Sequence, residues 1–532
     1  MSTMTGTGQL VRLILRRDRY LLALWILPLC LIPISYVPPF ADLYPTAAAR
    51  LQYADNAGFT VLYGRLSGTS LGEFITWRLG FVPVMVGLIS LLTVIRHTRV
   101  EEETGRRELL GATMVGRHAD LAAALAATFG ANLALAALLA LGMPSQGLPP
   151  TGSLALGLQF AAAGWMFAAV GAVAAQLTGS AGSAREIAAS VLGVAWLLRA
   201  AGDTSGQAGG GLARLSWMSP IGWVQRIRPY GDERWWLLAV AAGLTAVLAA
   251  AAVALSARRD LGAGLLAARP GPAAAASPLR SPLALAWRLH WALAAGWTAG
   301  FAVVGVVLGG VAASVGDIVQ GNQDLEELFA RLGGRSGLVD AYLASIMGML
   351  GLIAAAYAIQ ATLRLRSEES GGRAEPVLAT AVGRLRWAAS HLVMAVLGPA
   401  AALLAAGLTC GLAYGLDTGD VGHQLPRVLA GAIVQLPPVW VLAAVAVALF
   451  GLRPRLAPAA WGALAVCLLL GLVGAAIRLD QWLLDLSPFT HVPKSPGGAV
   501  AAAPLVVLAT VAVVLTIAGL VGLRRRDLPA TP

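Results

Sequence analysis

Charged side chains occur in the same arrangement at two places in the chain, 266 residues apart. In each place two glutamates precede a glycine, and an arginine and a third glutamate follow it. Such a run is typical of an acidic helical turn, a glycine break and a short amphipathic helix. Carboxylates and guanidinium groups so spaced can form ion pairs and hydrogen bonds at a protein contact. The residues concerned are Glu102, Glu103, Gly105, Arg106 and Glu108 in the first copy, and Glu368, Glu369, Gly371, Arg373 and Glu375 in the second.

Two interpretations of these runs stay open on the residues alone. Leu109, Leu110 and Met114 stand at helical spacing beside the first set of charges, which is typical of a surface that docks a partner protein. The simpler alternative is a solvated charged loop, which is the commoner case for a single loop of this kind. The duplication favours docking only modestly, because common ancestry also explains the likeness.

Residues that could bind a nucleotide or catalyse a reaction do not combine into a motif. A P-loop requires the pattern G-x-x-x-x-G-K-[ST], and the single lysine, Lys494, follows Pro493 rather than a glycine. The histidines stand near the ends of apolar runs or outside them, where we interpret them as interfacial residues. The three cysteines lie inside apolar runs and form no disulfide framework or zinc motif. We therefore expect no catalytic residues, cofactor or metal in this chain.

The likeness between the two runs extends over most of the chain. Three further segments recur at a shift of 266 or 267 residues: RLSGTS at 65 with RLGGRS at 331, ATMVGR at 112 with ATAVGR at 379, and RRDL at 258 with RRDL at 525. This pattern indicates the duplication of a unit of about 265 residues. We predict a first repeat over residues 1–265, a Pro/Ala-rich linker over 266–281 and a second repeat over 282–532.

The composition indicates a membrane protein. Hydrophobic residues make up 58% of the chain and charged residues 12%, and the mean hydropathy is +0.73, well outside the usual range of soluble domains. A helix crosses a bilayer with roughly 17–25 apolar residues, and no alternation typical of a β-barrel is present. We predict an all-α integral membrane protein with about twelve transmembrane helices, arranged as two tandem parallel six-helix repeats. The apolar runs centre near residues 30, 87, 131, 166, 194, 246, 302, 352, 402, 440, 467 and 511.

The arginines predict the orientation. With a cytoplasmic N-terminus, 25 of the 38 basic residues fall in cytoplasmic segments, as the positive-inside rule requires. The net charge of +11 is then explained by membrane topology and anionic lipid rather than by nucleic acid. We therefore predict a multi-pass protein of a bacterial inner or plasma membrane, with both termini and both charged runs in the cytoplasm.

Polar residues inside the apolar runs are few, and such residues often mark a transport pathway. Gln159 and Gln435 occupy comparable places in the two repeats, and each is followed by a tryptophan, Trp165 or Trp440. Gln360 lies late in the eighth run. These five residues are candidates for a substrate pathway, since amides and aromatic rings in an apolar cavity suit large amphipathic ligands. The structural alternative, interhelical packing and hydrogen bonding, is the commoner role for such pairs.

Taken together, the motifs resemble the permeases of type-2 ATP-binding-cassette exporters. They are the two EE(T/S)G runs, the basic amphipathic N-terminus LVRLILRRDRY and the (M/L)SP motif before the last span of each repeat. MSPIGWVQRIRPYGDERW, LSPFTHVPKSPGG and the segment starting at Gln435 resemble more closely the branch that exports polyketide antibiotics. The likeness covers nearly the whole chain. The second run departs from the first by inserting Gly372 and by placing Pro376 where the first has Leu109.

The resemblance implies a function. In that family the loop after the second span is a coupling helix seated in a groove of the ATPase, so both charged runs become expected ATPase contacts. ATP and Mg²⁺ are then expected in a separate ATPase subunit, in two copies, and the expected substrates are hydrophobic or amphipathic small molecules such as polyketide antibiotics. Two alternatives stay open: a proton-coupled secondary drug transporter, which needs buried carboxylates that the spans largely lack, and a non-transporting membrane scaffold.

Overall fold

The computed structural model describes residues 3–54, 57–111, 114–207, 211–260, 262–266, 274, 277–317, 334–473, 480–498 and 501–527. Every regular element in these ranges is helical. The chain divides into two compact units, Met1–Gly271 and Pro272–Pro532. The division lies inside the Pro/Ala-rich segment 266–281, and each unit contains six of the twelve long apolar helices.

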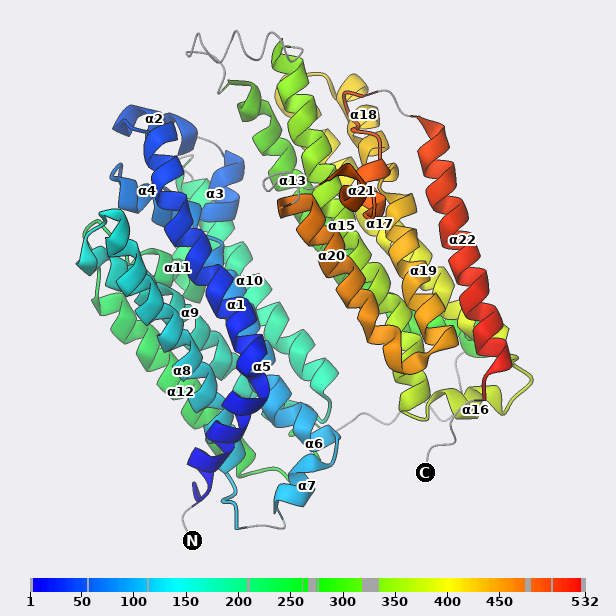
Figure 1. Ribbon diagram of the computed structural model, residues 1–532. Coiled ribbons are helices and arrows are strands. Elements are labelled where there is room, and N and C mark those ends of the chain that lie inside the picture. Colours follow the sequence, from blue (N-terminus) through cyan, green and yellow to red (C-terminus); the bar gives the residue numbers. More distant parts are fainter. Residues whose placement is uncertain are drawn as a thin grey trace. The chain divides into compact units, whose positions relative to one another are not determined.

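Unit 1 contains long helices joined by short ones at both ends (Figure 1). A π-helical turn, Arg96–Val100, continues α5 into α6, and the 3-10 turns Met143–Gln146 and Gly211–Met218 follow α8 and α10. The helices are α1 (Thr7–Leu43), α2 (Ala47–Ala54), α3 (Ala57–Tyr63), α4 (Leu71–Arg78), α5 (Val82–Ile95), α6 (Glu101–Glu103), α7 (Arg106–Gly111), α8 (Ala119–Gly142), α9 (Pro150–Leu177), α10 (Ala181–Gln207), α11 (Pro220–Gln225) and α12 (Trp236–Ser256).

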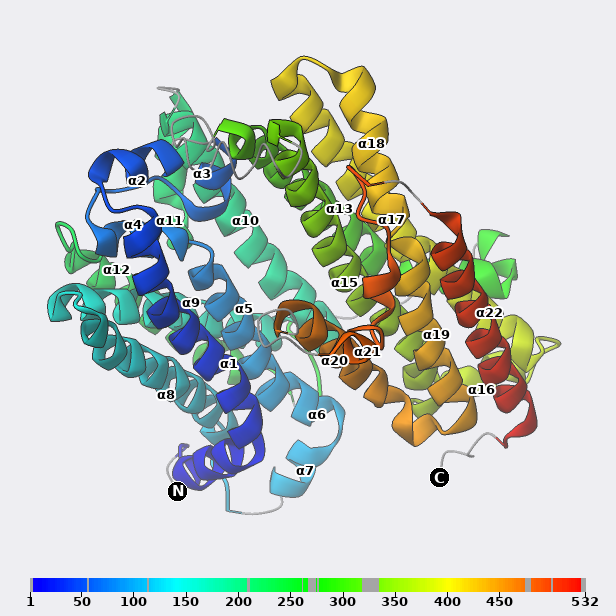
Figure 2. The same cartoon turned by 45° about the horizontal axis from the view of Figure 1, so that its top comes forward.

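Unit 2 has a similar make-up, seen from a second direction in Figure 2. Short 3-10 turns at Ser277–Arg280, Pro454–Ala459 and Pro488–His491 precede or join its helices. The helices are α13 (Pro282–Asp317), α15 (Gly334–Ser370), α16 (Ala374–Leu378), α17 (Arg384–Thr418), α18 (Val421–Ile433), α19 (Leu436–Leu452), α20 (Ala460–Val473), α21 (Gln481–Leu484) and α22 (Ala502–Arg525).

Twelve helical stretches of the described chain are long and apolar enough to cross a membrane, and they coincide with the twelve predicted runs. The protein is thus an all-α membrane protein. The fifth stretch covers Ala181–Gly206 and includes the fully buried Arg199. The guanidinium of Arg199 donates to the carbonyl oxygens of Thr60 and Leu62, both at 3.2 Å, so a charge within this helix finds backbone partners.

Small residues let the helices of each unit approach closely, as is usual between helices in lipid. α9 is the most buried stretch of unit 1, and a Cβ on Gly157 would lie 2.4 Å from the carbonyl oxygen of Ala136 in α8. In unit 2, a Cβ on Gly451 of α19 would meet the carbonyl oxygen of Gly519 in α22 at 1.8 Å. Any larger residue at these places would push the two helices apart.

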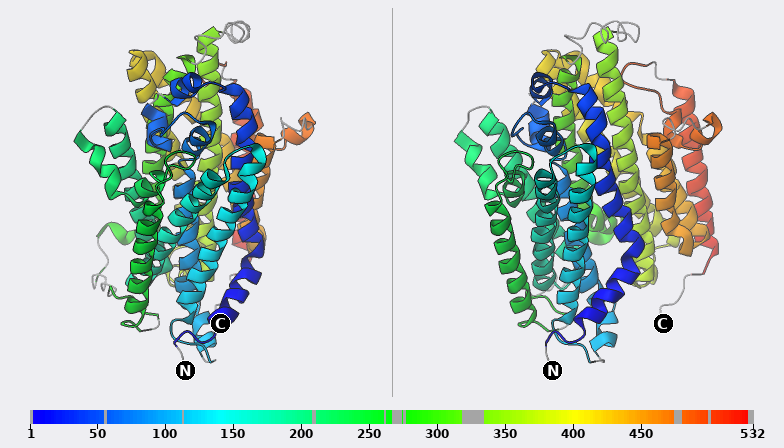
Figure 3. Two further views of the ribbon diagram at one scale, coloured as in Figure 1. Left: turned by 90° about the vertical axis from the view of Figure 1, so that its left-hand side faces the viewer. Right: turned by 60° about the vertical axis from the view of Figure 1, so that its left-hand side comes forward.

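The charged runs lie at one end of each unit. In unit 1, α6 and α7 lie beside the N-terminus, whereas α2, α3 and α4 lie at the opposite end, and both views in Figure 3 agree on this. In unit 2, α16 lies at the same end of the unit as the C-terminal end of α22. The π-helical turn before α6 adds a residue to the helix, which is a feature frequent at functional sites.

Candidate functional site

Glu102, in the first charged run, is buried and surrounded by arginines. Its Oε2 lies 2.9 Å from Arg99 Nη1 and 2.9 Å from Arg259 Nη2, and its Oε1 lies 2.7 Å from Arg259 Nη1. Oε1 also accepts the backbone N–H of Gly262 at 2.9 Å. Only 4% of the Glu102 side chain is exposed. Arg259 follows the end of α12, so the carboxylate ties the start of the loop to the end of the last span of unit 1.

Arg117, at the C-terminal end of the same loop, also binds Arg259. Arg117 Nη2 donates to the carbonyl oxygen of Arg259 at 3.3 Å and to that of Ala257 at 2.9 Å. Arg259 is therefore bonded to both ends of the loop: its side chain pairs with Glu102, and its carbonyl oxygen accepts from Arg117. We call these three residues, Glu102, Arg117 and Arg259, the loop clamp of unit 1.

Unit 2 contains an equivalent loop clamp, made of Glu369, Arg384 and Arg526. Arg526 Nη1 lies 2.7 Å from Glu369 Oε1, and Arg384 Nη1 donates to the carbonyl oxygen of Arg526 at 2.7 Å. The sequence separations are the same in both clamps, 157 residues for the ion pair and 142 for the carbonyl bond. The contacts therefore follow a shift of 267, and Glu369, rather than Glu368, takes the place of Glu102.

The first loop also contacts most other helices of unit 1. Arg17 of α1 lies 2.7 Å from Glu101, and Arg107 lies 2.8 Å from Asp120 of α8. Arg99 donates to the carbonyl oxygen of Ala175 in α9 at 3.0 Å, and Glu103 accepts the first backbone N–H of α10, that of Ala181, at 2.6 Å. Together with the clamp on the end of α12, the segment around α6 is bonded to the other five apolar stretches of its unit or to their ends.

The four glutamates at the start of the two runs thus have partners within the chain. Glu368 accepts from Arg373 Nε at 3.1 Å, and the other three make the contacts given above. Exposed charged side chains follow the glycine in each run. Arg106 is 56% exposed and Arg373 is 59% exposed, and Glu108 and Glu375 are exposed as well.

The expected amphipathic helix of the first run is shorter than its pattern suggests. α7 ends at Gly111, and Met114, which is 74% exposed, lies beyond that end. The side chains of Leu109 and Leu110 lie outside the described residues. In the second run α16 covers Ala374–Leu378 and begins after Gly372, whose φ of 67° is in the left-handed region that favours glycine.

Four of the five substrate-pathway candidates make packing or hydrogen-bond contacts within their own unit. Trp165 and Trp440 each donate their indole N–H to a backbone carbonyl oxygen of a neighbouring helix, Phe129 at 3.2 Å and Val396 at 3.4 Å. Gln360 accepts from the indole of Trp297 at 3.2 Å, and Gln435 is buried against Gly351. Gln159 differs from these four because it lines a cavity.

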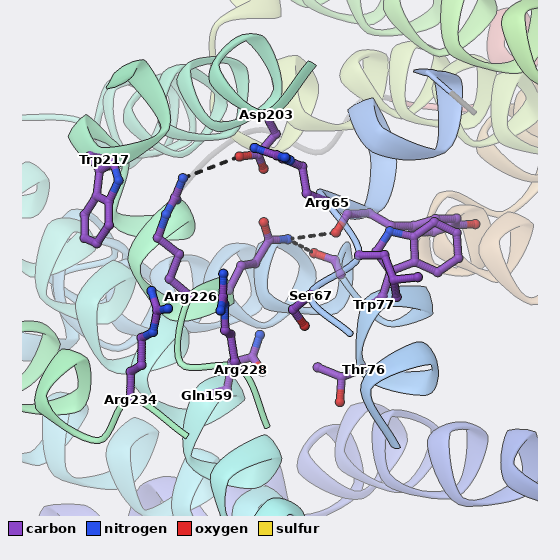
Figure 4. Close-up of a pocket in the computed structure, with 14 residues that line it drawn as sticks. Arg65, Ser67, Thr76, Trp77, Gln159, Asp203, Trp217, Arg226, Arg228 and Arg234 are labelled. Carbon is purple, nitrogen blue, oxygen red and sulfur yellow. Dashed lines mark hydrogen bonds and ion pairs between the residues drawn. The ribbon is translucent and has the colours of Figure 1, made fainter. Parts of the chain in front are cut away.

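That cavity has a volume of about 360 Å³ and lies at the end of unit 1 opposite the charged loop (Figures 1 and 4). The segment before α4, the helices α9 and α10, and the loop from α11 to α12 all contribute to its wall. Arg226 points towards Asp203 from this loop, and Arg228 and Arg234 lie on the same side (Figure 4). Basic and polar side chains dominate the wall: Arg65, Arg226, Arg228, Arg234, Asp203, Gln159, Gln225 and Thr76.

A wedged tyrosine fixes the arginine-bearing loop. Arg228 and Tyr230 have φ angles of 54° and 65°, a conformation that non-glycine residues adopt only where the surroundings hold it. The Tyr230 ring fills the space that a Cβ on Gly72 or Gly152 would need. Its hydroxyl lies 3.1 Å from Ser153 Oγ, and burial raises the pKa of Tyr230 to about 12, so the phenol stays protonated.

The structure also contains buried titratable pairs that the sequence analysis missed. Asp18 in α1 is 2% exposed and lies 2.6 Å from Nε2 of His97. In unit 2, His290 and His391 are both buried, with 3.0 Å between their ring nitrogens. The sequence analysis interprets these histidines as interfacial residues, and the structure shows that their side chains are buried within their units. Single polar residues at the ends of apolar runs give no sequence signal for such pairing, because the partners lie 79 and 101 positions apart.

Comparison with known proteins adds two findings. The family model described as the C-terminal domain of the multidrug efflux system permease Rv1217c matches residues 279–524. The multidrug efflux system permease protein Rv1217c of Mycobacterium tuberculosis is 45% identical to the chain, over an alignment that covers 99% of the chain and 96% of that protein. The likeness therefore extends across both units.

Proposed function

The chain belongs to the family of multidrug efflux system permeases, and from this premise we propose that it is the membrane-spanning subunit of an ATP-driven exporter. A separate ATPase, in two copies, binds ATP and Mg²⁺ and docks on the two charged loops. The exported molecules are hydrophobic or amphipathic. This assignment of the driving force goes beyond the family membership and rests on the construction of the loops.

The two loop clamps are the observation that carries the proposal. A loop can transmit the movement of an ATPase to the spans only if it is rigidly attached to them. Both loops are bonded at both ends to an arginine that follows the last span of their unit, through Glu102 and Arg117 or through Glu369 and Arg384. A solvated connector needs no such attachment, and its ion pairs would be exposed and weak.

The clamps assign different tasks to the charged residues of each run. Glu102 and Glu369 hold the two loops to the spans, whereas the exposed residues after the glycine contact the ATPase. In the first loop these are Arg106 and Glu108, and in the second they are Arg373 and Glu375. Exposed charges of both signs suit a complementary protein surface that can bury them as pairs.

The contact prediction concerns these exposed residues. We expect Arg106→Ala combined with Glu108→Ala to weaken association with the ATPase by at least about tenfold, since removing one partner of a buried interfacial charge pair costs about 2–5 kcal/mol. The melting temperature of the purified permease should not change, because both side chains are exposed. The measurement is co-purification and equilibrium binding of the ATPase that accompanies the wild-type chain in its own cells.

Arg16→Ala is the matched control for this experiment, since Arg16 is exposed near the same end of unit 1 and lies outside the loop. The corresponding change in the second loop, Arg373→Ala with Glu375→Ala, should have a smaller effect, because Gly372 and Pro376 make that loop irregular. Wild-type binding by both double variants would leave the loops as simple connectors.

The orientation is a further part of the proposal. The distribution of basic residues, 25 of 38 on one side, supports a bacterial plasma membrane location with the termini and the charged loops in the cytoplasm. An impermeant maleimide should therefore label Ser205→Cys in intact cells and Met114→Cys only after permeabilisation. Met114 is 74% exposed, so the label can reach this position once it is inside. The opposite labelling pattern would invert the topology and place the loops out of reach of any ATPase.

One observation favours the proton-coupled alternative. Asp18 lies inside the first apolar stretch, it is 2% exposed, and it pairs with His97, as a titrating carboxylate of a secondary transporter would. However, Arg96 lies 3.1 Å from the other oxygen of Asp18, so the carboxylate already has a second, cationic partner within the chain. The pair also adjoins the first charged loop, where it serves to fix α1 to the end of α5.

A further inference from the structure

The cavity of unit 1 has an excess of positive charge. Arg65, Arg226, Arg228 and Arg234 line it, and Asp203 is the single carboxylate among its lining residues. Arg226 lies 3.6 Å from Asp203. Arg228 and Arg234 share Asp232, at 3.2 and 2.9 Å, but that aspartate is 53% exposed and stands outside the lining. Guanidinium groups present a planar set of donors that matches the oxygens of a phosphate or carboxylate, so the charge favours an acidic ligand.

The cavity also contains polar atoms without partners. Thr76 Oγ1, Gln159 Oε1 and Gln225 Oε1 are buried and have no hydrogen-bond partner in the described chain. The whole residues Thr76 and Gln159 are 8% and 2% exposed. Buried polar groups are normally bonded, and an unpartnered one costs stability unless a ligand or water satisfies it. Three such atoms around one cavity therefore point to a ligand that meets them.

The hydrogen-bonding roles of these atoms indicate which chemical groups the ligand carries. The amide group of Gln225 donates to the carbonyl oxygens of Tyr63 at 3.3 Å and Gly80 at 2.7 Å. Its oxygen is therefore left as an acceptor. An oxyanion cannot donate to it, whereas a hydroxyl group can. The wall therefore fits a ligand that has both an oxyanion, which the arginines bind, and hydroxyl groups, which donate to the glutamine oxygens.

An apolar surface adjoins the cavity at Trp217. Trp217 lines the cavity, yet 43% of it is exposed, and it stacks on Trp236 with 6.4 Å between ring centroids. Its neighbour Met218 is 68% exposed. A volume of about 360 Å³ is near the lower end of ligand pockets, roughly 300–1,000 Å³, so it suits a polar head whose tail lies outside.

The cavity lies at a depth along the helices that a lipid head group can reach. Gln159 is the tenth residue of α9, which begins at Pro150, so it lies about 13 Å along the helix axis from that end at 1.5 Å per residue. The cavity therefore extends from the end of unit 1 into the level of its membrane-spanning helices, where the head group of an amphipath anchored in the bilayer can reach it.

We propose that this cavity binds the head group of an amphipathic acid that carries hydroxyl groups next to its oxyanion, such as a polyol phosphate on an acyl chain. The arginines hold the oxyanion, the oxygens of Gln159 and Gln225 accept its hydroxyl groups, and Trp217, Met218 and Trp236 cover the start of the tail. A membrane phospholipid, an exported amphipathic acid and a soluble polyol phosphate share this head chemistry. The site needs no ATPase, so it stands independently of the driving force.

The test is a binding measurement on the purified full chain in a neutral detergent, by native mass spectrometry and thermal shift. Four probes separate the sources and the chemistry: dioleoyl phosphatidylglycerol, dioleoyl phosphatidic acid, dioleoyl glycerol and glycerol 1-phosphate. We expect phosphatidylglycerol to bind at least about tenfold more tightly than dioleoyl glycerol, since one hydrogen bond to a charged group accounts for roughly that factor. It should bind about tenfold more tightly than phosphatidic acid, which lacks the hydroxyl groups for the two glutamine oxygens, and more tightly than glycerol 1-phosphate, which lacks the tail.

Four variants of the chain connect the binding to the cavity. Arg65→Gln and Arg234→Gln should each weaken phosphatidylglycerol binding about tenfold. Thr76→Val keeps the shape and removes an unpartnered hydroxyl, so it should weaken binding while leaving the melting temperature of the free protein unchanged or higher. Arg214→Gln is the matched control, because Arg214 is exposed in the turn that bears Trp217 and does not line the cavity.

Four results would contradict the proposal or a part of it. Equal binding of phosphatidylglycerol by wild type and by all three cavity variants would overturn the site. If dioleoyl glycerol bound as tightly as phosphatidylglycerol, the site would not select an acidic head group. If phosphatidic acid bound as tightly as phosphatidylglycerol, the site would not select hydroxyl groups. Binding of glycerol 1-phosphate as tight as that of phosphatidylglycerol would show a soluble ligand and refute the role of the tail.

Discussion

Replacing Glu102 with alanine should lower the free energy of unfolding of the permease by about 3–5 kcal/mol, the cost of breaking a buried ion pair by removing one partner. Arg99 and Arg259 are 0% and 5% exposed in their side chains. Without the carboxylate, both would keep a buried charge with no counter-ion. We expect the variant protein to melt at a lower temperature in detergent and to lose drug export, since the first loop would no longer be attached to α12.

Neighbouring residues provide the comparison for this variant. Glu101 pairs with Arg17 and Arg106, whose side chains are 39% and 56% exposed, so Glu101→Ala should cost only about 0–1 kcal/mol. Glu369→Ala should lie between the two, because Arg526 is 15% exposed and is the one arginine bonded to Glu369 in the described chain. Similar melting temperatures for Glu101→Ala and Glu102→Ala would show that the first loop clamp does not stabilise the protein.

The sequence predicted the helices well, for a physical reason. Backbone groups in lipid must be satisfied within one helix, so each span has to appear as one continuous apolar run. The twelve helical stretches accordingly lie where the runs predicted them. The partners of the buried Arg199 in the fifth stretch could not be predicted, because its bonds to the carbonyl oxygens of Thr60 and Leu62 depend on a segment that lies far away in the sequence.

The clamps could be predicted only in part. The repeated glutamate pairs, ATxVGR segments and RRDL segments are all visible in the sequence, yet nothing in it shows that they meet. Glu102 and Arg259 are 157 positions apart, and a pair at that distance is decided by how the spans pack. The duplication carried a usable signal, since three separate polar motifs recur together while the spans between them differ in sequence.

The cavity was beyond prediction from the sequence. Only Gln159 among its lining residues stood out as a candidate, because it is polar inside an apolar run. Arg65, Arg226 and Arg234 come from loops, where an arginine is unremarkable. Their convergence depends on the unusual backbone at Arg228 and Tyr230, which is held by a ring packed against Gly72 and Gly152. Side-chain packing of this kind leaves no periodic pattern in the sequence.

The second large effect that we expect is an absolute dependence on the ATPase. Proteoliposomes that contain the purified chain alone should neither hydrolyse ATP nor accumulate ethidium against a gradient when ATP is added. Adding the ATPase that accompanies the chain in its own cells should produce both activities, because the driving force then reaches the spans through the clamped loops. A chain with Arg106→Ala and Glu108→Ala should need at least about tenfold more ATPase than the wild type to reach half-maximal activity.

The most direct test of the ATP-driven mechanism is ethidium uptake by inside-out proteoliposomes, measured with and without the ATPase and with the proton gradient present or collapsed. We predict uptake that requires both ATP and the ATPase and that persists when the proton gradient is collapsed. Uptake by the chain alone, driven by a proton gradient and abolished by Asp18→Asn, would contradict this account and assign the driving force to the buried Asp18–His97 pair.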